Sequence, residues 1–219
     1  MGGSQEKVRK GRLGREAYFN AAFKILATTG FQELTVDNLS AELGATKGSF
    51  YHHFAGMPEF TEALVAAWEA RVSEIFTEMV ALPPMEALAR SMEMIQQWPL
   101  QADAALRSWA WANPVVKAAV RRQEAVWERL MVSWLEQVVP DPERCRLLAH
   151  MTLALLAGMM QLQHPPDADL INAVALELIH NNIGIELLPD GTQRPQDLTV
   201  EASPKPRRTG RRKTTSPAG

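Results

Sequence analysis

The stretch from Gly44 to Phe54, GATKGSFYHHF, holds the residues whose types and spacing best suit a chemical role. It combines a lysine, two hydroxyl side chains, a tyrosine and two adjacent histidines. Three kinds of site are compatible with it: a phosphate-binding loop, a metal site, or the turn and helix of a DNA-reading motif. A phosphate-binding loop has the pattern Gly-x-x-x-x-Gly-Lys-Ser/Thr after a buried strand. Here Lys47 precedes Gly48 and no strand is predicted before it, so this kind of site is excluded.

The two adjacent histidines do not form the core of a metal site. His52 and His53 point about 100° apart on a helix, so they cannot share an ion as an i, i+4 pair does. The other soft or nitrogen ligands stand alone in the sequence: His150, His164, His180 and Cys145. The sequence therefore predicts no metal site and calls for no cofactor. It also contains no GxSxG motif or nucleotide-binding loop, and we expect no catalytic activity.

The third kind of site is a helix-turn-helix. Two short predicted helices, 36–43 and 47–54, are joined by a turn that contains Gly44, which matches the geometry of that motif. Phe50 and Phe54 lie on one face of the second helix, where they can be buried. The opposite face then projects with Lys47, Gly48, Ser49, Tyr51 and His52. From this pattern alone, a DNA-reading helix and a plain helical bundle with an aromatic corner are about equally compatible with the stretch.

The elements that must position this stretch are all helical. Apolar residues recur at helical spacing almost throughout, and prolines or glycines mark the boundaries. The predicted helices span 16–29, 36–43, 47–54, 58–80, 85–97, 100–112, 114–138, 143–164 and 168–185. No segment alternates in the manner of a strand, so the predicted fold class is all-α.

Charge is distributed unevenly over the 219 residues. The net charge is −2, but residues 1–15 carry +4, residues 189–219 carry +4 and the middle carries −10. Two basic ends on an acidic body suit a polyanionic partner. A single cysteine fits a reducing cytoplasm, and we predict neither a signal peptide nor a membrane span.

Residues 16–64 resemble the DNA-binding domain of TetR-family transcriptional repressors. The resemblance lies in a helix that ends at Gly30–Phe31, in Thr35–Val36, and in a Gly-Ser-Phe-Tyr-x-x-Phe signature at 48–54. It implies a three-helix N-terminal DNA-binding domain followed by a helical ligand-binding and dimerisation domain, about nine helices in all. The implied divisions are a basic arm at 1–15, the helix-turn-helix at 16–60, the ligand domain at 61–188 and a disordered basic tail at 189–219.

The resemblance also assigns roles to residues. Thr35 caps the second helix beside the DNA backbone, and Tyr51 occupies the position of a phosphate-binding tyrosine. The full set of expected DNA contacts is Thr35, Thr46, Lys47, Gly48, Ser49, Tyr51 and His52. Many members carry a lysine where this chain has Met57, and the basic arm is expected to compensate. The arm's basic residues are Lys7, Arg9, Lys10, Arg12 and Arg15.

The C-terminal domain is expected to dimerise and to bind a ligand. The homodimer interface is placed at 143–185, where LLAHMTLALLAGMMQL is apolar nearly all round and Gly158 permits close approach. Tryptophan and methionine are dense between 92 and 134, and such residues line apolar pockets. The candidate ligand-binding residues are Met92, Ile95, Trp98, Leu106, Trp109, Trp111, Trp127, Met131 and Trp134.

These expectations combine into one function. The chain is predicted to be a cytoplasmic homodimeric repressor that binds a palindromic operator and is released by a small, mainly apolar or aromatic molecule. Two alternatives remain from the sequence: an all-α small-molecule-binding or enzymatic domain with a vestigial helix-turn-helix, and a DNA-binding activator.

Overall fold

The computed structural model describes residues 14–162 and 166–183, and within those ranges every regular element is a helix. The predicted all-α class is therefore confirmed. The elements are α1 (Arg15–Thr28), the 3₁₀ helix η1 (Phe31–Glu33), α2 (Val36–Glu42), α3 (Lys47–His53), α4 (Met57–Val80), α5 (Pro84–Gln97), α6 (Leu100–Trp109), α7 (Pro114–Leu135), α8 (Pro142–Leu162) and α9 (Ala168–Ile183).

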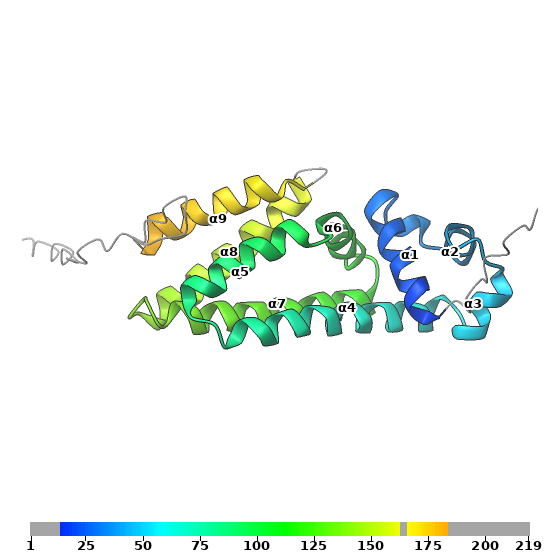
Figure 1. The fold of residues 1–219 in the computed structure, drawn as a ribbon, viewed down its shortest axis with the longest axis horizontal. Helices are drawn as coiled ribbons and strands as arrows, with labels where there is room; N and C mark the ends of the chain where they lie inside the picture. The colour runs from blue at the N-terminus through cyan, green and yellow to red at the C-terminus, as the bar shows by residue number, and fades with distance from the viewer. Residues whose placement is uncertain (1–13, 163–165, 184–219) are drawn as a thin grey trace, which may run out of the picture.

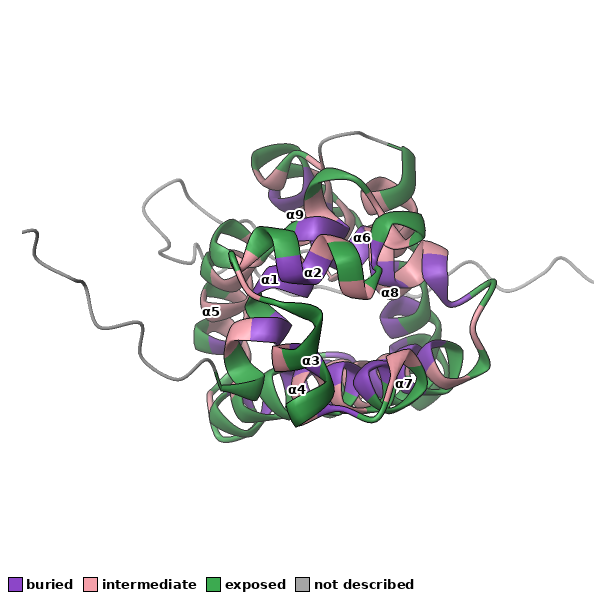
Figure 2. Ribbon diagram, turned by 90° about the vertical axis from the view of Figure 1, so that its right-hand side faces the viewer, coloured by how far each residue is buried: buried purple, intermediate pink, exposed green. Residues whose placement is uncertain are grey.

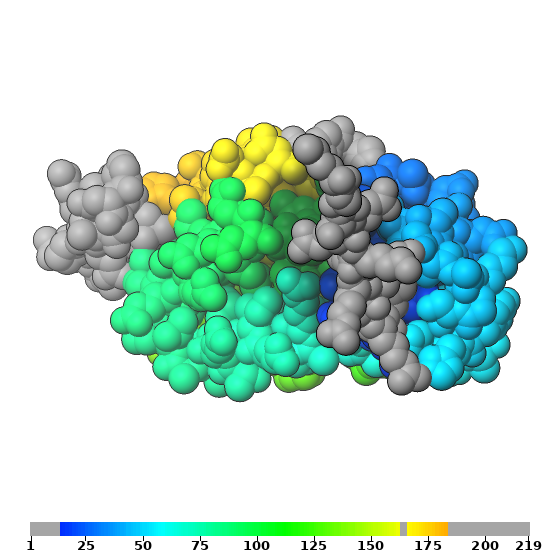
Figure 3. Space-filling view, turned by 45° about the vertical axis from the view of Figure 1, so that its right-hand side comes forward, coloured from blue at the N-terminus to red at the C-terminus, as the bar shows by residue number. Residues whose placement is uncertain are grey.

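Helices α1, α2 and α3 form one end of an elongated molecule, which we call the N-terminal unit (Figure 1). Helices α4 and α7 run side by side along the rest of its length, and α5, α8 and α9 lie over them. We call α4 to α9 the cavity region. Within the cavity region, helix α6 lies next to the N-terminal unit and packs against α1. In the space-filling view, the N-terminal unit occupies one end and the cavity region the other (Figure 3).

Most helix boundaries agree with the sequence prediction to within two residues, and two C-terminal ends differ by three. Helix α6 ends at Trp109 rather than 112 because Pro114 disfavours a helical residue before it. Asn113 is extended instead, and its Oδ1 accepts hydrogen bonds from the N–H groups of Val115 (2.9 Å) and Val116 (3.2 Å), which caps α7. Helix α7 ends at Leu135 rather than 138, and η1 was not predicted.

One apolar core cluster contains residues of both parts of the chain. In the end-on view, the buried stretches lie mostly on the inward sides of the helices (Figure 2). Helix α4 joins the two parts. Its Phe60 and Leu64 pack against the N-terminal unit, and its Val72 and Phe76 line a cavity further along. The predicted boundary between residues 60 and 61 thus falls inside α4. Of the predicted terminal segments, residues 1–13 and 189–219 lie outside the described residues.

Helix α8 carries an apolar face that the described chain does not cover. Leu147, Met151 and Leu162 are exposed, and a Cβ built on Gly158 would have no neighbour within 4 Å. By length and mean hydropathy (1.3) α8 would suffice to cross a membrane, which the sequence analysis did not anticipate. The helix instead packs against α6, α7 and α9, and a third of its most apolar window is buried.

Candidate nucleic-acid interface and ligand cavities

Helix α3 is held in place by an aromatic cluster. Phe50 is fully buried, and its ring packs edge-on against Tyr18 of α1, with centroids 5.7 Å apart. Phe54 packs edge-on against Phe60 of α4 at 4.9 Å. Because both phenylalanines point inward, as their i, i+4 spacing predicted, the other face of α3 must point outward.

Both short helices begin with a threonine cap. The Thr35 Oγ1 accepts a hydrogen bond from the N–H of Asn38 (3.2 Å), and the Thr46 Oγ1 accepts one from the N–H of Ser49 (3.3 Å). Each cap uses the hydroxyl as an acceptor, so each O–H remains available to donate to a phosphate. Between the helices, Gly44 adopts a left-handed conformation with φ of 57°, which makes the tight turn possible without strain.

Most of the residues expected to contact DNA lie on the outward face. Thr35, Thr46, Lys47, Gly48, Tyr51 and His52 are exposed, and Ser49 is half-buried. Lys47 is paired with Asp37 at the start of α2, with 2.6 Å between Nζ and Oδ1. The hydrogen bond that Lys47 donates to Asp37, together with the negative charge of Asp37, raises the pKa of Lys47, so the lysine is positive at neutral pH. This exposed pair must open, or be shared, when Lys47 contacts a phosphate.

Gly48 is not required by the packing of the chain. A Cβ added there would meet only the Thr46 Oγ1, at the ordinary contact distance of 3.7 Å, and its φ lies outside the left-handed range. Glycine nevertheless costs roughly 1 kcal/mol relative to alanine inside a helix. Packing within the described chain thus gives no reason for a glycine at this position.

Ser49 is oriented by a buried residue that the sequence analysis missed. The Tyr18 O–H donates a hydrogen bond of 2.9 Å to the Ser49 Oγ. Since the serine oxygen accepts that bond, its own proton is directed outward and can be donated. Tyr18 is 31 residues away in sequence, so no local pattern could have indicated the contact.

Arg15, the last basic residue of the predicted arm, makes structural contacts at the end of α3. Its Nη1 donates to the carbonyl oxygen of His53 at the end of α3 (3.0 Å), and its guanidinium lies 4.4 Å from the centre of the Phe54 ring. An ion pair with Glu59 adds a third contact, at 3.6 Å. Arg15 therefore fixes the C-terminal end of α3 against α1 and α4.

The N-terminal unit is not basic by itself. Residues 14–56 contain three Lys or Arg and four Asp or Glu residues. Residues 1–13 contain Lys7, Arg9, Lys10 and Arg12 against one glutamate, but they lie outside the described residues. A strong electrostatic attraction to a polyanion would therefore need basic residues from outside the N-terminal unit, and residues 1–13 hold four of them.

Two neighbouring cavities lie in the cavity region. Cavity 1, of about 110 Å³, is bounded by helices α4 to α9, and cavity 2, of about 90 Å³, by α5, α7, α8 and α9. Ile95 and Trp127 line both of them. Trp98 lines cavity 1, and the remaining predicted lining residues, Met92, Met131 and Trp134, line cavity 2. Six of the nine candidate ligand-binding residues thus line one or both of these cavities.

Neither cavity is lined by Trp109, Trp111 or Leu106, although all three were predicted to bind the ligand. Trp109 is buried at the junction with the N-terminal unit, where its ring stacks on Phe31 with centroids 6.3 Å apart and planes 10° apart. Leu106 is buried in the core. Trp111 follows the end of α6 and is 89% exposed, beside Lys117. Helical spacing identified these residues as apolar without showing which neighbour they face.

Cavity 1 has a charged side that the sequence analysis did not identify. Arg107 donates from Nε to the Asp103 Oδ2 (3.0 Å) and from Nη1 to the Glu124 Oε1 (2.6 Å). Burial alone would lower the pKa of Arg107, but the charges and hydrogen bonds of both carboxylates outweigh it and raise the pKa. The Asp103–Arg107 spacing of four is visible in the sequence, whereas the contribution of Glu124 from α7 depends on the tertiary fold.

Buried polar atoms without a protein partner gather around the cavities. Among the described residues, such atoms are the indole N–H groups of Trp68 and Trp134, the side-chain oxygens of Gln123 and Asn172, and the Ser40 hydroxyl. The first four belong to residues that line cavity 1 or cavity 2. A buried polar group without a partner costs free energy, which a bound molecule can recover.

The described residues contain no group of three or more His, Cys, Asp or Glu side chains placed to hold a metal ion. The His52 and His53 rings lie 5.2 Å apart, centre to centre, in an edge-on arrangement.

Comparison with known proteins decides between the two readings of the opening stretch. The family described as bacterial regulatory proteins of the tetR family matches residues 19–64, which span α1, α2, α3 and the start of α4. The N-terminal domain belongs to the TetR family. Members of this family are DNA-binding transcriptional regulators, so the helix-turn-helix identified here is that of a TetR-family domain.

Solved structures show that the TetR-like fold extends well beyond that domain. A TetR-family regulator from a Rhodococcus species is 20% identical, with a TM-score of 0.62 over 77% of this chain and 98% of the other. A TetR regulator from Legionella pneumophila is 12% identical, with a TM-score of 0.66 over 78% and 97%. At such identities the likeness concerns the fold alone. No curated protein matches the chain.

Proposed function

We propose that this TetR-family chain is a cytoplasmic repressor that binds a palindromic operator as a homodimer and is released by a small, mainly apolar molecule. The observation that carries the DNA-binding part is the outward face of α3. That face presents Lys47, Gly48, Tyr51 and His52 while Phe50 and Phe54 anchor the opposite face. A helix fixed in this way suits insertion into a major groove, with its N-terminal residues at the base edges and hydroxyls at the phosphates.

The uncovered apolar face of α8 supports the dimer. Leu147 and Met151 are spaced by four residues and are exposed, and Leu170 of α9 is exposed as well. Gly158 leaves open space beside the helix, so a second helix can approach closely. A second copy of the chain would bury these residues, and two α3 helices would then meet successive major grooves about 34 Å apart.

Helix α6 supports a coupling between ligand and DNA. Its Asp103 and Arg107 line cavity 1, and its Trp109 stacks on Phe31 in the N-terminal unit. A ligand that shifts α6 would therefore displace η1 and α1, to which α6 packs. Release of DNA requires that the ligand bind the displaced arrangement more tightly than the DNA-bound one.

The test uses the full chain and a random-sequence duplex library. DNA selected by the protein is compared with a scrambled duplex of equal length by fluorescence anisotropy at two salt concentrations. We expect selective binding that weakens steeply with salt, because phosphate contacts release counterions. Equal and weak binding to both duplexes would contradict the proposal.

That contrary result would favour the alternative of an α-helical ligand-binding protein with a vestigial reader. Met57, where many family members have a lysine, and the acidic excess of residues 14–56 favour this alternative. An activator is a second alternative. A transcription assay with the selected sequence placed beside a promoter separates it from a repressor by the sign of the response.

A further inference from the structure

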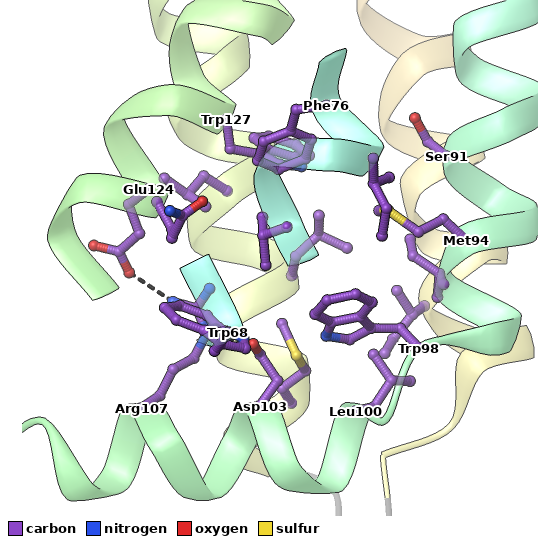
Figure 4. Close-up of a pocket in the computed structure, with 18 residues that line it drawn as sticks. Trp68, Phe76, Ser91, Met94, Trp98, Leu100, Asp103, Arg107, Glu124 and Trp127 are labelled. Carbon is purple, nitrogen blue, oxygen red and sulfur yellow. Dashed lines mark hydrogen bonds and ion pairs between the residues drawn. The ribbon is translucent and has the colours of Figure 1, made fainter. Parts of the chain in front are cut away.

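Cavity 1 combines an apolar lining with one polar side. Asp103 and Arg107 of α6 and Gln123 and Glu124 of α7 form that side. Asp103 and Gln123 are more than nine-tenths buried. Figure 4 shows Trp127 and Phe76 at the opposite side of the cavity, away from Arg107 and Asp103. Such an arrangement suits a molecule with an apolar body and one polar end.

The charge of the polar side is net negative. One guanidinium meets two carboxylates, and each carboxylate accepts from Arg107 through one oxygen. Among the described residues, the second oxygens, Asp103 Oδ1 and Glu124 Oε2, accept no hydrogen bond. A cation at this side would meet one excess negative charge, whereas an anion would be repelled by two carboxylates.

The side chain of Gln123 adds an acceptor. Its Oε1 is buried and has no partner within the described chain, although its residue lines the cavity. An N–H group of a ligand would satisfy this oxygen and remove the cost of leaving it unpaired. A neutral apolar molecule offers no such group.

Aromatic rings complete the polar side. Trp68 and Trp98 line the cavity, and in Figure 4 both are drawn toward the end that holds Asp103 and Arg107. An ammonium group is attracted to the face of an indole, and the attraction strengthens where water is excluded. The volume of about 110 Å³ is similar to the roughly 150 Å³ of an engineered core cavity that holds benzene, so a body with a single ring fits.

We propose that cavity 1 binds a protonated amine on a single-ring apolar body, an arylalkylammonium ion. Its N–H groups donate to Gln123 Oε1 and to the free oxygens of Asp103 and Glu124, and its ring lies among Phe76, Trp127 and their apolar neighbours. This inference rests on the ligand-binding part of the proposed function and names the class of that ligand.

The test compares three probes that share one body: phenylbutylamine, phenylbutanol and phenylbutyrate, which are cationic, neutral and anionic at neutral pH. Binding to the full chain is followed by tryptophan fluorescence, since Trp68, Trp98 and Trp127 line the cavity, and by calorimetry. We expect the amine to bind at least about tenfold more tightly than the alcohol, because an opposite charge nearby in a partly buried site adds that much or more. The carboxylate should bind most weakly.

A matched pair of variants locates the charge. Glu124→Gln removes one negative charge from the cavity while keeping the shape of the side chain. Glu128→Gln makes the same change one turn further along α7, outside both cavities. We expect the preference for amine over alcohol to shrink about fivefold or more in Glu124→Gln and to be unchanged in Glu128→Gln. Melting curves of both variants show whether they remain folded.

Each contrary result contradicts a different part of the proposal. If the alcohol or the carboxylate binds as tightly as the amine, the cationic class is wrong, while the cavity remains a ligand site. An equal loss in both variants overturns the assignment of the charge to the cavity. If none of the probes binds, the inference and the ligand-binding part of the function are both contradicted. DNA selection by the same preparation without ligand then shows separately whether the reader works.

Discussion

The N-terminal unit and the cavity region use aromatic residues in opposite ways. In the N-terminal unit, Tyr18, Phe50 and Phe54 fill the interior by edge-on packing, and of the described buried side-chain atoms without a partner only the Ser40 hydroxyl lies there. In the cavity region, Trp68 and Trp127 border open space, and the other unpartnered atoms lie around it. The close packing of the N-terminal unit fixes the outer face of α3, whereas the cavity region leaves interior space that a small molecule could fill.

This difference separates two kinds of residue function. A residue that acts on DNA in the proposed function lies outside a filled core, so its substitution should change DNA binding without a loss of stability. A residue that acts on a ligand lies inside an unfilled core, so stability and binding are linked at each position.

The filled and unfilled cores should respond differently to truncation. Phe50→Ala removes a fully buried ring and is expected to lower the free energy of unfolding by about 3–5 kcal/mol. Ile95→Ala, in a side chain that already borders both cavities, should cost only about 2 kcal/mol, the low end for a buried isoleucine. Chemical denaturation followed by circular dichroism measures both, and equal losses would break the contrast.

The exposed face of α8 should be sensitive to charge although it contributes little to the monomer. Met151→Arg places a cation in the proposed interface and is expected to weaken the dimer at least about 100-fold, since an unpaired charge buried in an interface is strongly unfavourable. Sedimentation measures the dimer. A variant with an arginine at Ala66, which is exposed on α4, serves as control. An unchanged dimer would exclude this face as the interface.

Removal of residues 1–13 should affect DNA affinity but not ligand affinity. The deletion takes away Lys7, Arg9, Lys10 and Arg12. We expect DNA binding to fall by about 10-fold or more. The slope of log affinity against log salt should become shallower by up to about 7, at roughly 0.9 per lost phosphate contact and four contacts in each protomer of the dimer. Anisotropy at several salt concentrations measures both. An unchanged slope would mean that the basic residues make no phosphate contacts.

Gly48→Ala should change stability and DNA affinity in opposite directions. The added methyl has room within the chain and improves helix propensity, so stability should rise by about 0.5–1 kcal/mol. The same methyl on the outer face of α3 should weaken DNA binding about tenfold. Thermal melting and anisotropy on one preparation test both parts. A more stable variant with normal DNA affinity would remove Gly48 from the interface.

Tyr18→Phe should have the smallest effect on DNA affinity, and a decrease in that affinity would indicate that Tyr18 orients Ser49. The substitution removes the hydroxyl that donates to the Ser49 Oγ and keeps the buried ring. We expect a loss of stability of about 1 kcal/mol and a decrease in DNA affinity of about two- to fivefold, because the serine proton is no longer directed outward. Ser49→Ala in the same assay gives the upper limit of this effect, and a larger loss in Tyr18→Phe would contradict the account.

The N-terminal unit could be predicted closely from sequence because its signals are local. Thr35 and Thr46 are caps in the structure as their positions indicated, and the i, i+4 spacing of Phe50 and Phe54 set the buried face of α3. The polar partners could not be predicted. Lys47 pairs with a carboxylate on another helix, and Ser49 with a tyrosine on a third.

For the cavity region, the sequence indicated which residue types would line a pocket but not which of those residues would face it. The density of tryptophan and methionine indicated a pocket, and most of those residues line one. Trp109 and Trp111 show the limit of that reasoning. Trp109 is buried against the N-terminal unit and Trp111 is exposed beyond the end of α6, and the periodicity of apolar residues predicted neither environment. The charged side of cavity 1 joins α6 to α7 and depends on how those helices cross.

Hydroxyl-radical footprinting of the full chain on its selected duplex shows directly whether a dimer reads DNA through its two α3 helices. If two α3 helices of a dimer read the DNA, the footprint should show two protected regions related by a two-fold axis and centred about one helical turn apart. The protection should be lost with Met151→Arg, which disrupts the proposed dimer. A single protected region, or a footprint that persists in that variant, would contradict a dimeric reader built on α3 and α8.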